Sequence, residues 1–408
     1  MNSKGKIALA SAIAAVAALA AITITFSPRI DQMPDGNVPN NTTGTGNTTD
    51  NVPIRNETGT APVSDKPKTV INVISSPSAF PFVEKWTAEY NNENLGIVKV
   101  NYSNEVDNVS MYSNISDFLA HNSADLAITG RVVSASENFT YFKSPFLPVS
   151  PQAIALVYNI PGFPDIPSGL RLDAPTLAAI LGGNITYWDD PKIKTLNPGM
   201  NLPNEKITIV HEGKAGSASD LLDRYLFVSN QTINWPEGSL VGDSADNLST
   251  IVRQTPYSIG YVDFSYAIQT KMTYAALQNS DGEYISPSID SIDKAIQNGT
   301  LIERPEVNND WSGIMSEMRS RLLPPATSIG QLGNGSYPIV GFYYAAFEKD
   351  DVVDRETIDA DNKAVAIIDL VKWIADDQQG QKVLQDMQYP SIYEQNEVLK
   401  DYLDTMLA

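Results

Sequence analysis

The sequence predicts an α/β protein of two interleaved lobes. Short apolar segments with the length of strands alternate along the chain with helical segments that carry an apolar face, and this alternation is typical of layered α/β folds. The chain has 408 residues, of which 42% are hydrophobic, so it can form about two or three domains with ordinary cores. An apolar run and a polar stretch precede the first expected strand.

The expected elements follow one another in a regular order. The first strand leads through a polar turn into a helix that begins near Pro81, which is the basic strand, turn and helix unit of such folds. We expect strands at 70–74, 97–102, 125–129, 207–210 and 258–262. We expect a helix that starts at 81–86 and helices at 115–121, 176–181 and 364–374. A further helix should carry Leu221, Leu222, Tyr225 and Leu226 on one face.

The helix at 176–181 has the clearest boundary signals. Asp173 can accept a hydrogen bond from the first turn, Pro175 suits a first-turn position, and Gly182 and Gly183 can end the helix.

Composition excludes several classes of protein. The chain has no cysteine and only two histidines, His121 and His211. Disulfides, cysteine-ligated metals, a thiolate nucleophile and a lipid-modified cysteine are therefore excluded, and a multi-histidine metal centre is poorly supplied. The formal charge is 28 − 48 = −20. Because nucleic-acid binding relies on clustered Lys and Arg, we expect no nucleic-acid partner. We also expect no cofactor.

Residues 1–30 are typical of a signal or anchor segment. Lys4 and Lys6 precede an uncharged run at 7–26, which as a helix of about 30 Å is long enough to cross a bilayer. This length favours an uncleaved membrane anchor with the basic flank inside, and the small residues at 18–21 leave a cleaved signal as the alternative.

Residues 31–69 form a linker rich in Asn, Thr, Gly and Pro that we expect to be disordered, because it has too little apolar surface to fold. The linker and the folded region contain many Asn-x-Ser/Thr sequons, which together with the leader predict an exported glycoprotein. The sequons lie at Asn40, Asn41, Asn47, Asn56, Asn101, Asn108, Asn114, Asn138, Asn184, Asn230, Asn247, Asn298 and Asn334.

Four segments give the chain a family resemblance. Residues 170–210 read LRLDAPTLAAILGGNITYWDDPKIKTLNPGMNLPNEKITIV, 255–288 read TPYSIGYVDFSYAIQTKMTYAALQNSDGEYISPS, 150–162 contain IALVYNIPG, and 337–341 read YPIVG. Over about 70–407 the chain resembles the phosphate-binding proteins of phosphate ABC transporters. The resemblance implies a type 2 periplasmic-binding-protein fold (Venus flytrap) with two crossover hinges. Lobe one would comprise 70–153 and 342–408, and lobe two 154–341.

The resemblance also implies phosphate contacts in lobe one. Ser78, Ala79 and Phe80 stand where the family has a phosphate-binding Thr and the following backbone N–H groups. Fixed donors of this kind replace the water that a buried phosphate loses. An ordinary helix cap is the alternative role for Ser78. Ser113 is a second candidate, in a segment where the family commonly has a Gly/Ser-rich loop.

The strand at 125–129 leads to Thr129, Gly130 and Arg131. In the family an Asp that accepts a phosphate proton, or a Ser-Arg-Pro variant, follows this strand. Gly130 stands at the Asp or Ser position, so the acceptor is missing, while Arg131 matches the Arg of the variant. Thr129 and Arg131 remain candidate oxyanion contacts, and a solvated Arg131 is the alternative.

The loop of lobe two departs most from the family pattern Arg-x-Asp-Gly-Ser-Gly-Thr. Here 212–219 read EGKAGSAS, which puts Glu212 or, after a shift of one residue, Gly213 at the Arg position. A carboxylate there would repel a dianion. The candidate ligand residues of this loop are Lys214, Gly216, Ser217, Ala218 and Ser219.

Together these features predict an extracytoplasmic, membrane-tethered monomer that captures inorganic phosphate, or a related oxyanion, and delivers it to the permease subunits of an ABC transporter. Because the Arg and Asp contacts are replaced, a surface or adhesion module with the same fold, or a binder of another oxyanion, is the alternative. A phosphate-ester hydrolase would need a nucleophile or metal set, and the resemblance assigns Asp189 and Asp190 to a structural turn. We therefore expect no enzyme.

Overall fold

A computed structural model describes residues 69–103, 124–130, 146–162, 169–213, 216–228, 233–299, 333–347 and 358–392. These ranges belong to one unit of the chain, Pro62–Ala408, and the other unit is Met1–Ala61. The expected anchor at 7–26, the linker except Thr69, and the expected helix at 115–121 lie outside the described residues.

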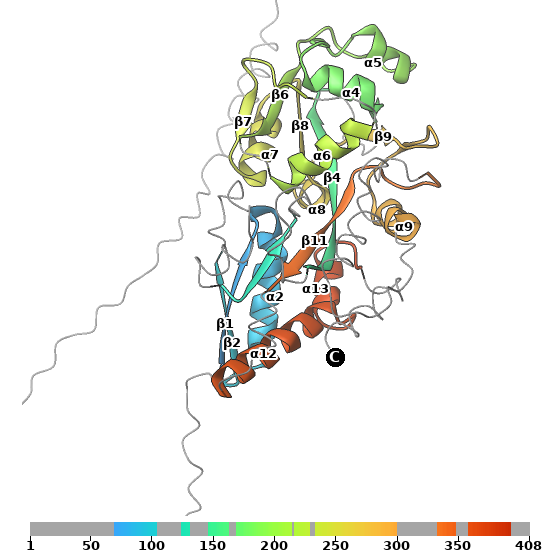
Figure 1. Cartoon of the computed structure of the whole chain (residues 1–408). Coiled ribbons are helices and arrows are strands. Elements are labelled where there is room, and N and C mark those ends of the chain that lie inside the picture. Colours follow the sequence, from blue (N-terminus) through green and yellow to red (C-terminus); the bar gives the residue numbers. More distant parts are fainter. Residues whose placement is uncertain are drawn as a thin grey trace, which may run out of the picture. The chain divides into compact units, whose positions relative to one another are not determined.

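The described residues form an α/β structure (Figure 1). Its strands are β1 (Thr69–Ser75), β2 (Val98–Ser103), β3 (Leu126–Thr129), β4 (Phe146–Asn159), β5 (Arg171–Leu172), β6 (Thr208–Glu212), β7 (Leu240–Gly242), β8 (Ser258–Asp263), β9 (Ala276–Gln278), β10 (Tyr284–Ile285) and β11 (Val340–Ala346). Its helices are η1 (Pro77–Ala79), α2 (Phe80–Glu93), α4 (Ala174–Leu181), α5 (Pro191–Leu196), α6 (Ser217–Val228), α7 (Ala245–Gln254), α8 (Phe264–Gln269), α9 (Ile289–Gly299), α12 (Ile358–Ala375) and α13 (Gly380–Asp386).

Eight of these strands form a mixed sheet in the order β2-β1-β3-β11-β4-β8-β6-β7, and β10-β9-β5 form a small second sheet. In the first half β1 pairs in parallel with β2 and β3, and in the second half β6 pairs in parallel with β7 and β8. α2 and α12 pack on the first half, and α7 packs on the second half. This arrangement is the expected two-lobed periplasmic-binding-protein fold.

The 14-residue strand β4 joins the two halves. Its residues 146–153 pair antiparallel with β11, whereas 154–159 pair antiparallel with β8. Figure 1 shows β4 running alongside β11 between the upper and lower groups of elements. β4 and β11 therefore occupy the place of the two crossover hinges, and the exact lobe boundaries stay a prediction.

Most of the expected elements are present, although α2 and α12 extend several residues beyond the expected ranges and β3 is one residue shorter than expected. The expected strand at 70–74 is β1, and the expected helices at 81–86, 221–226 and 364–374 are parts of α2, α6 and α12. The predicted cap of α4 is confirmed, because the Asp173 side chain accepts a 2.8 Å hydrogen bond from the backbone N–H of Thr176. Gly183 follows the helix with φ +71°, a conformation that favours glycine.

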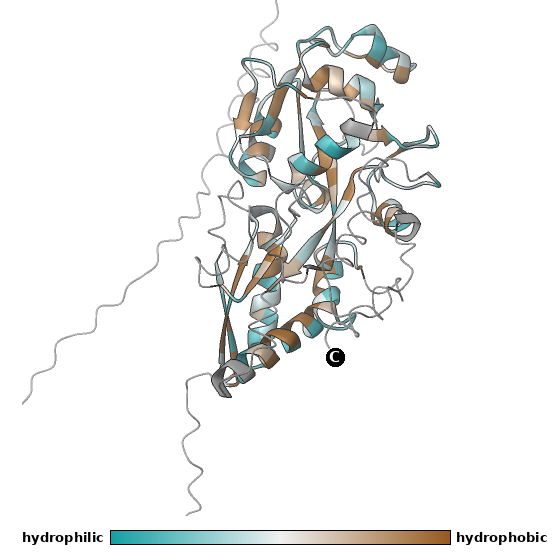
Figure 2. Ribbon diagram, in the orientation of Figure 1, coloured by the Kyte–Doolittle hydropathy of each residue, from teal (hydrophilic) through white to brown (hydrophobic). Residues whose placement is uncertain are grey.

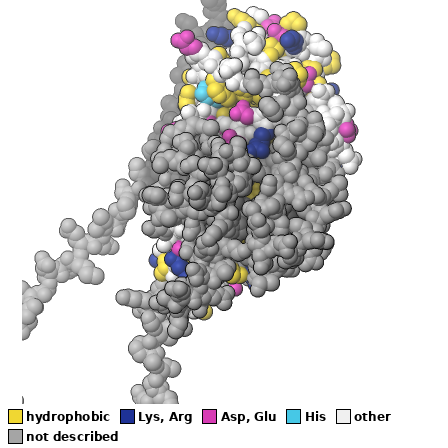
Figure 3. All heavy atoms as spheres, viewed as in Figure 1, with side chains coloured by type: hydrophobic (Ala, Val, Ile, Leu, Met, Phe, Trp, Pro, Cys, Tyr) yellow, Lys and Arg dark blue, Asp and Glu magenta, His cyan; other side chains and the backbone are white. Residues whose placement is uncertain are grey.

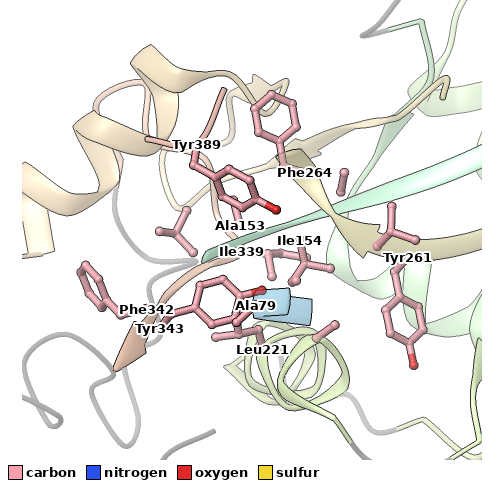
Figure 4. Close-up of a cluster of buried hydrophobic side chains, with 14 of the residues drawn as sticks. Ala79, Ala153, Ile154, Leu221, Tyr261, Phe264, Ile339, Phe342, Tyr343 and Tyr389 are labelled. Carbon is pink, nitrogen blue, oxygen red and sulfur yellow. The ribbon is translucent and has the colours of Figure 1, made fainter. Parts of the chain in front are cut away.

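The core is apolar on both sides of the junction. Figure 2 shows hydrophobic residues on the central strands and an alternation of hydrophobic and hydrophilic residues along the helices. At the junction of the halves, Leu221 of α6 packs on Gly341 of β11, where an added Cβ would lie 2.6 Å from Leu221 Cδ2. Figure 4 shows Leu221 beside Ala79 and Tyr343 in this buried cluster. Side chains from both lobes thus pack together in one buried apolar cluster.

Candidate ligand-binding site

Two helix starts from opposite halves of the sheet meet at the candidate site. Ser78 lies in η1, just before α2, and Ser217 is the first residue of α6. Their Oγ atoms lie 3.4 Å apart although the residues are 139 positions apart in the chain. The N–H groups in the first turn of a helix have no partner within the helix, so each start is suited to an anion.

The predicted lobe-one contacts, Ser78, Ala79 and Phe80, each make different contacts in the structure. Ala79 is the N-cap of α2 and no side chain caps this helix, so the Ser78 hydroxyl is not a helix cap. That hydroxyl lies 3.5 Å from Ser76 Oγ in addition to its contact with Ser217. The backbone N–H of Ala79 already donates to the carbonyl of Ser76 at 2.9 Å, and the Phe80 ring stacks on Tyr102.

The end of β3 also lies next to the two helix starts of the candidate site. Thr129 is buried at the end of the strand. A Cβ added to Gly130 would lie 2.6 Å from Gln152 Oε1, 2.7 Å from Ser217 Cβ and 2.8 Å from Ser217 Oγ. Only a residue without a side chain fits there. Three predicted contacts, Ser113, Arg131 and Lys214, lie outside the described residues.

The start of α6 brings the remaining predicted residues together. Gly216 accepts the first helical hydrogen bond, from the N–H of Asp220 at 3.0 Å. Ser217 and Ala218 are buried, and Ser219 is partly buried. These residues stand at the start of a 12-residue helix, and their role as anion contacts stays a prediction.

Glu212, at the end of β6, turns onto this same helix start. Its Oε2 accepts hydrogen bonds from Ser219 Oγ at 2.6 Å and from Ser219 N at 3.3 Å. The Ser219 hydroxyl also lies 2.7 Å from Tyr261 OH. Burial raises the pKa of the Glu212 carboxyl, and the hydrogen bonds from Ser219 and Gly216 act in the opposite direction. The carboxylate thus occupies donors that the resemblance assigns to the ligand.

A chain of hydrogen bonds connects Ser217 with the hinge strands. Gln152 of β4 donates from Nε2 to Ser217 Oγ at 2.9 Å and to Tyr343 OH at 3.0 Å. Tyr343 of β11 donates to Asp263 Oδ2 at 3.0 Å. Asp263 caps α8 through the N–H of Ser265. Complete burial raises the pKa of Asp263 to about 7, and burial raises the pKa of Tyr343 strongly.

The sequence prediction missed Gln152, Tyr343 and Asp263. The available signal was an amide side chain in a largely apolar segment, since Gln152 stands in SPQAIALV. An unpaired polar group is costly inside a core, so a buried Gln indicates partners that the sequence does not name.

The neighbouring carboxylates Asp189 and Asp190 have structural hydrogen bonds. In the part of the chain that the structure describes, no group of three or more His, Asp or Glu side chains is arranged to hold a metal. Asp190 caps α5 by accepting a hydrogen bond from the N–H of Lys192. The Asp189 carboxylate accepts hydrogen bonds from the side chains of Lys194 and Asn204. As expected, this carboxylate pair stabilises a turn.

Comparisons with known proteins agree with this architecture. Residues 56–377 match the PBP superfamily domain. The chain is 28% identical over 341 residues to the phosphate-binding protein PstS of Methanocaldococcus jannaschii, covering 78% of this chain and 81% of that protein. It is 29% identical over 342 residues to the phosphate-binding protein PstS of Xylella fastidiosa, covering 81% and 84%.

Two solved structures share the fold. One is a high affinity periplasmic phosphate-binding protein bound with phosphate, with a TM-score of 0.59 and 14% identity over 82% of this chain and 92% of that one. The other is a phosphate binding protein from Stenotrophomonas maltophilia, with a TM-score of 0.55 and 12% identity over 82% and 93%. At these identities the likeness shows the fold alone.

Proposed function

The chain belongs to the PBP superfamily, and on that premise we propose that it is a solute-binding protein that captures inorganic phosphate between its two lobes and delivers it to the permease of an ABC transporter. Relatives named as phosphate-binding proteins match most of the chain and support this choice of ligand. The proposal includes no enzymatic step.

The observation that carries the proposal is the meeting of Ser78 and Ser217. Each hydroxyl lies at the start of a helix, the two come from opposite halves of the sheet, and their oxygens are 3.4 Å apart. A ligand that receives hydrogen bonds from both lobes stabilises their closed arrangement, because it binds that arrangement more tightly than an open one. An anion is the favoured ligand, since both helix starts present partial positive charge.

The net charge of −20 does not oppose this ligand. Exposed charges more than about 8 Å away are largely screened at physiological salt. On the face shown in Figure 3, acidic and basic side chains are interspersed over the described part of the surface. The local charges at the start of α6 therefore matter more than the total.

Calorimetric titration of the purified full-length chain with inorganic phosphate tests the proposal. We expect saturable binding, and we expect Ser78→Ala and Ser217→Ala each to weaken it about two- to tenfold, the worth of one hydrogen bond. Ser239→Ala is the matched control, because that hydroxyl donates to the Pro236 carbonyl in a turn of lobe two. No phosphate binding by a correctly folded chain would overturn the proposal.

We further propose that the protein is extracytoplasmic and tethered to the membrane through residues 7–26. The support is the apolar run itself with its basic flank. Within the described ranges, no helix has the length and apolarity needed to cross a bilayer. The test compares membrane fractions of the wild type with those of Ala15→Arg/Leu19→Arg. Each arginine costs about 3 kcal/mol at a helix centre, so we expect this variant to leave the membrane. Thr45→Arg/Thr60→Arg, in the linker, is the charge-matched control.

We also propose that the protein is a glycosylated monomer. The sequon residues Asn101, Asn184 and Asn334 are exposed, as a glycan requires. Light scattering coupled to size exclusion, before and after enzymatic removal of N-glycans, measures both the oligomeric state and the carbohydrate mass.

A further inference from the structure

Gln152 is a buried amide side chain at the point where the two lobes and both hinge strands meet. It is fully buried in β4, in contact with Ser217 of lobe two and Tyr343 of β11. We propose that Gln152 contacts the ligand: its Oε1 accepts the hydrogen bond of a protonated oxyanion such as hydrogen phosphate. This inference rests on the proposed function and names the group that recognises the proton of its ligand.

The surrounding hydrogen bonds fix the orientation of the amide. Tyr343 OH donates to Asp263 Oδ2 and accepts from Gln152 Nε2. The second proton of Nε2 goes to Ser217 Oγ. Both protons of the amide nitrogen are used, and the oxygen has to point elsewhere.

The amide oxygen is an acceptor without a donor. Among the described residues, Gln152 Oε1 has no hydrogen-bond partner although it is buried. A buried acceptor left unpaired destabilises the fold, so its presence indicates a donor that binds there. The ordered Nε2 contacts hold this oxygen in place and keep it from turning toward Ser217 or Tyr343.

The oxygen lies beside the loop that lost the acceptor of the family pattern. A Cβ added to Gly130 would lie 2.6 Å from Gln152 Oε1, so the amide oxygen takes the space in which a side chain at position 130 would begin. The resemblance places an Asp there that accepts a proton from phosphate. In this chain the absence of a side chain at 130 makes room for an acceptor from β4.

This acceptor would distinguish phosphate from sulfate. At neutral pH phosphate carries a proton that it can donate, whereas sulfate carries none. An oxygen lone pair facing sulfate would meet another lone pair, and a site that leaves buried polar groups unpaired rejects the ligand that does not fit. Gln152 is thus expected to set selectivity as well as affinity.

The test measures the dissociation constants of inorganic phosphate and of sulfate by calorimetry at pH 7 on the full-length chain. We compare the wild type with Gln152→Met, which keeps the length but removes the acceptor, and with Gln152→Glu, which keeps an acceptor oxygen. Ser78→Ala is the control for a loss that is not selective, because a hydroxyl donor serves both anions equally and the Ser78 hydroxyl contacts Ser76 and Ser217 rather than the Gln152 amide. Circular dichroism verifies that each variant is folded.

We expect the wild type to prefer phosphate, Gln152→Met to reduce the phosphate-to-sulfate preference about tenfold or more, and Gln152→Glu to retain it. If Gln152 has only a structural role, Gln152→Met should weaken the binding of phosphate and of sulfate by the same factor. That result would overturn the inference while leaving the proposed function intact. A wild type that binds phosphate without preferring it to sulfate would overturn the inference even if Gln152→Met failed to fold. A wild type that binds no phosphate would overturn the proposed function and the inference with it.

Discussion

The carboxylate of Glu212 accepts a 2.6 Å hydrogen bond from the hydroxyl of Ser219, the third residue of α6. The backbone N–H of Ser219 also faces this oxygen, at 3.3 Å. Glu212 therefore satisfies donors at the start of its own lobe-two helix with its carboxyl group. An anionic ligand at α6 would compete with this internal carboxylate for the same donors and the same helix dipole.

Replacing Glu212 by Gln should strengthen anion binding. The amide oxygen can still accept from Ser219, but the charge that repels a dianion is gone, so we expect phosphate to bind about tenfold more tightly. Because burial raises the pKa of Glu212, its carboxyl is charged only above that pKa, and the gain should grow as the pH rises through it. Calorimetry on the wild type and Glu212→Gln between pH 5 and pH 8 measures the effect.

Glu237→Gln is the charge-matched control for this substitution, since Glu237 is exposed in a turn of the same lobe. It should leave the affinity unchanged. If Glu212→Gln bound phosphate no better than the wild type, Glu212 would not compete with the ligand.

A side chain at Gly130 should hold the lobes apart. In Gly130→Ala the new Cβ would lie 2.6 Å from Gln152 Oε1, the end of a side chain in the hinge strand β4, and 2.7 Å from Ser217 Cβ. The second contact joins a lobe-one loop to a lobe-two helix, and it is the overlap that a movement of the lobes can relieve. Opening the lobes relieves the overlap, so we expect a larger radius of gyration by small-angle X-ray scattering and a weaker affinity for phosphate. Gly130→Ala/Ser217→Gly removes the opposing Cβ and should recover the compact scattering profile. A Gly130→Ala profile identical to the wild type would show that the loop yields instead.

The sequence was sufficient to predict much of the scaffold. The strands at 70–74 and 207–210 could be identified because their apolar runs end in polar turns, and the cap at Asp173 because capping depends on a few adjacent residues. These are local signals, and the structure confirms them. The start of α6 could be predicted from a local signal too, because small and hydroxyl residues precede an apolar helix face there.

The contacts inside the site could not be predicted, because they join residues far apart in the chain. Gln152 is 191 positions from Tyr343 and 65 from Ser217. In the sequence Gln152 is one polar residue in an apolar strand, and only the pairing of β4 with both β11 and β8 places it at the junction. The direction of the Glu212 side chain, onto Ser219, likewise depends on how β6 and α6 pack.

The packing of α13 against lobe one should be sensitive to one methyl group. A Cβ added to Gly380 would lie 2.4 Å from Ile374 Cα and 2.5 Å from the Ile374 carbonyl oxygen, which are backbone atoms that cannot turn away. The Gly380 carbonyl also accepts a 2.7 Å hydrogen bond from Trp86 Nε1. We expect Gly380→Ala to lower the free energy of unfolding in urea by about 1–3 kcal/mol or more. Gln378→Ala, at an exposed position before α13, should change it by no more than about 0.5 kcal/mol.

The buried carboxyl of Asp263 should make stability depend on pH. Its pKa is raised by burial from an ordinary value of 3.8 to about 7, so between these values the folded chain binds a proton that the unfolded chain has lost. The free energy of unfolding must then fall as the pH rises from about 4 to about 7, by about 1.4 kcal/mol for each unit between the two pKa values. Above pH 7 this contribution becomes constant.

Asp263→Asn tests this dependence. An asparagine can still accept from the N–H of Ser265 and from Tyr343 OH, but it does not titrate, so the decline between pH 4 and pH 7 should become shallower. Urea unfolding at closely spaced pH values measures both curves. Asp243→Asn, at an exposed position after β7, should leave the wild-type slope unchanged. If the curves of the wild type and Asp263→Asn were parallel, Asp263 would be charged throughout and its burial compensated by the donors around it.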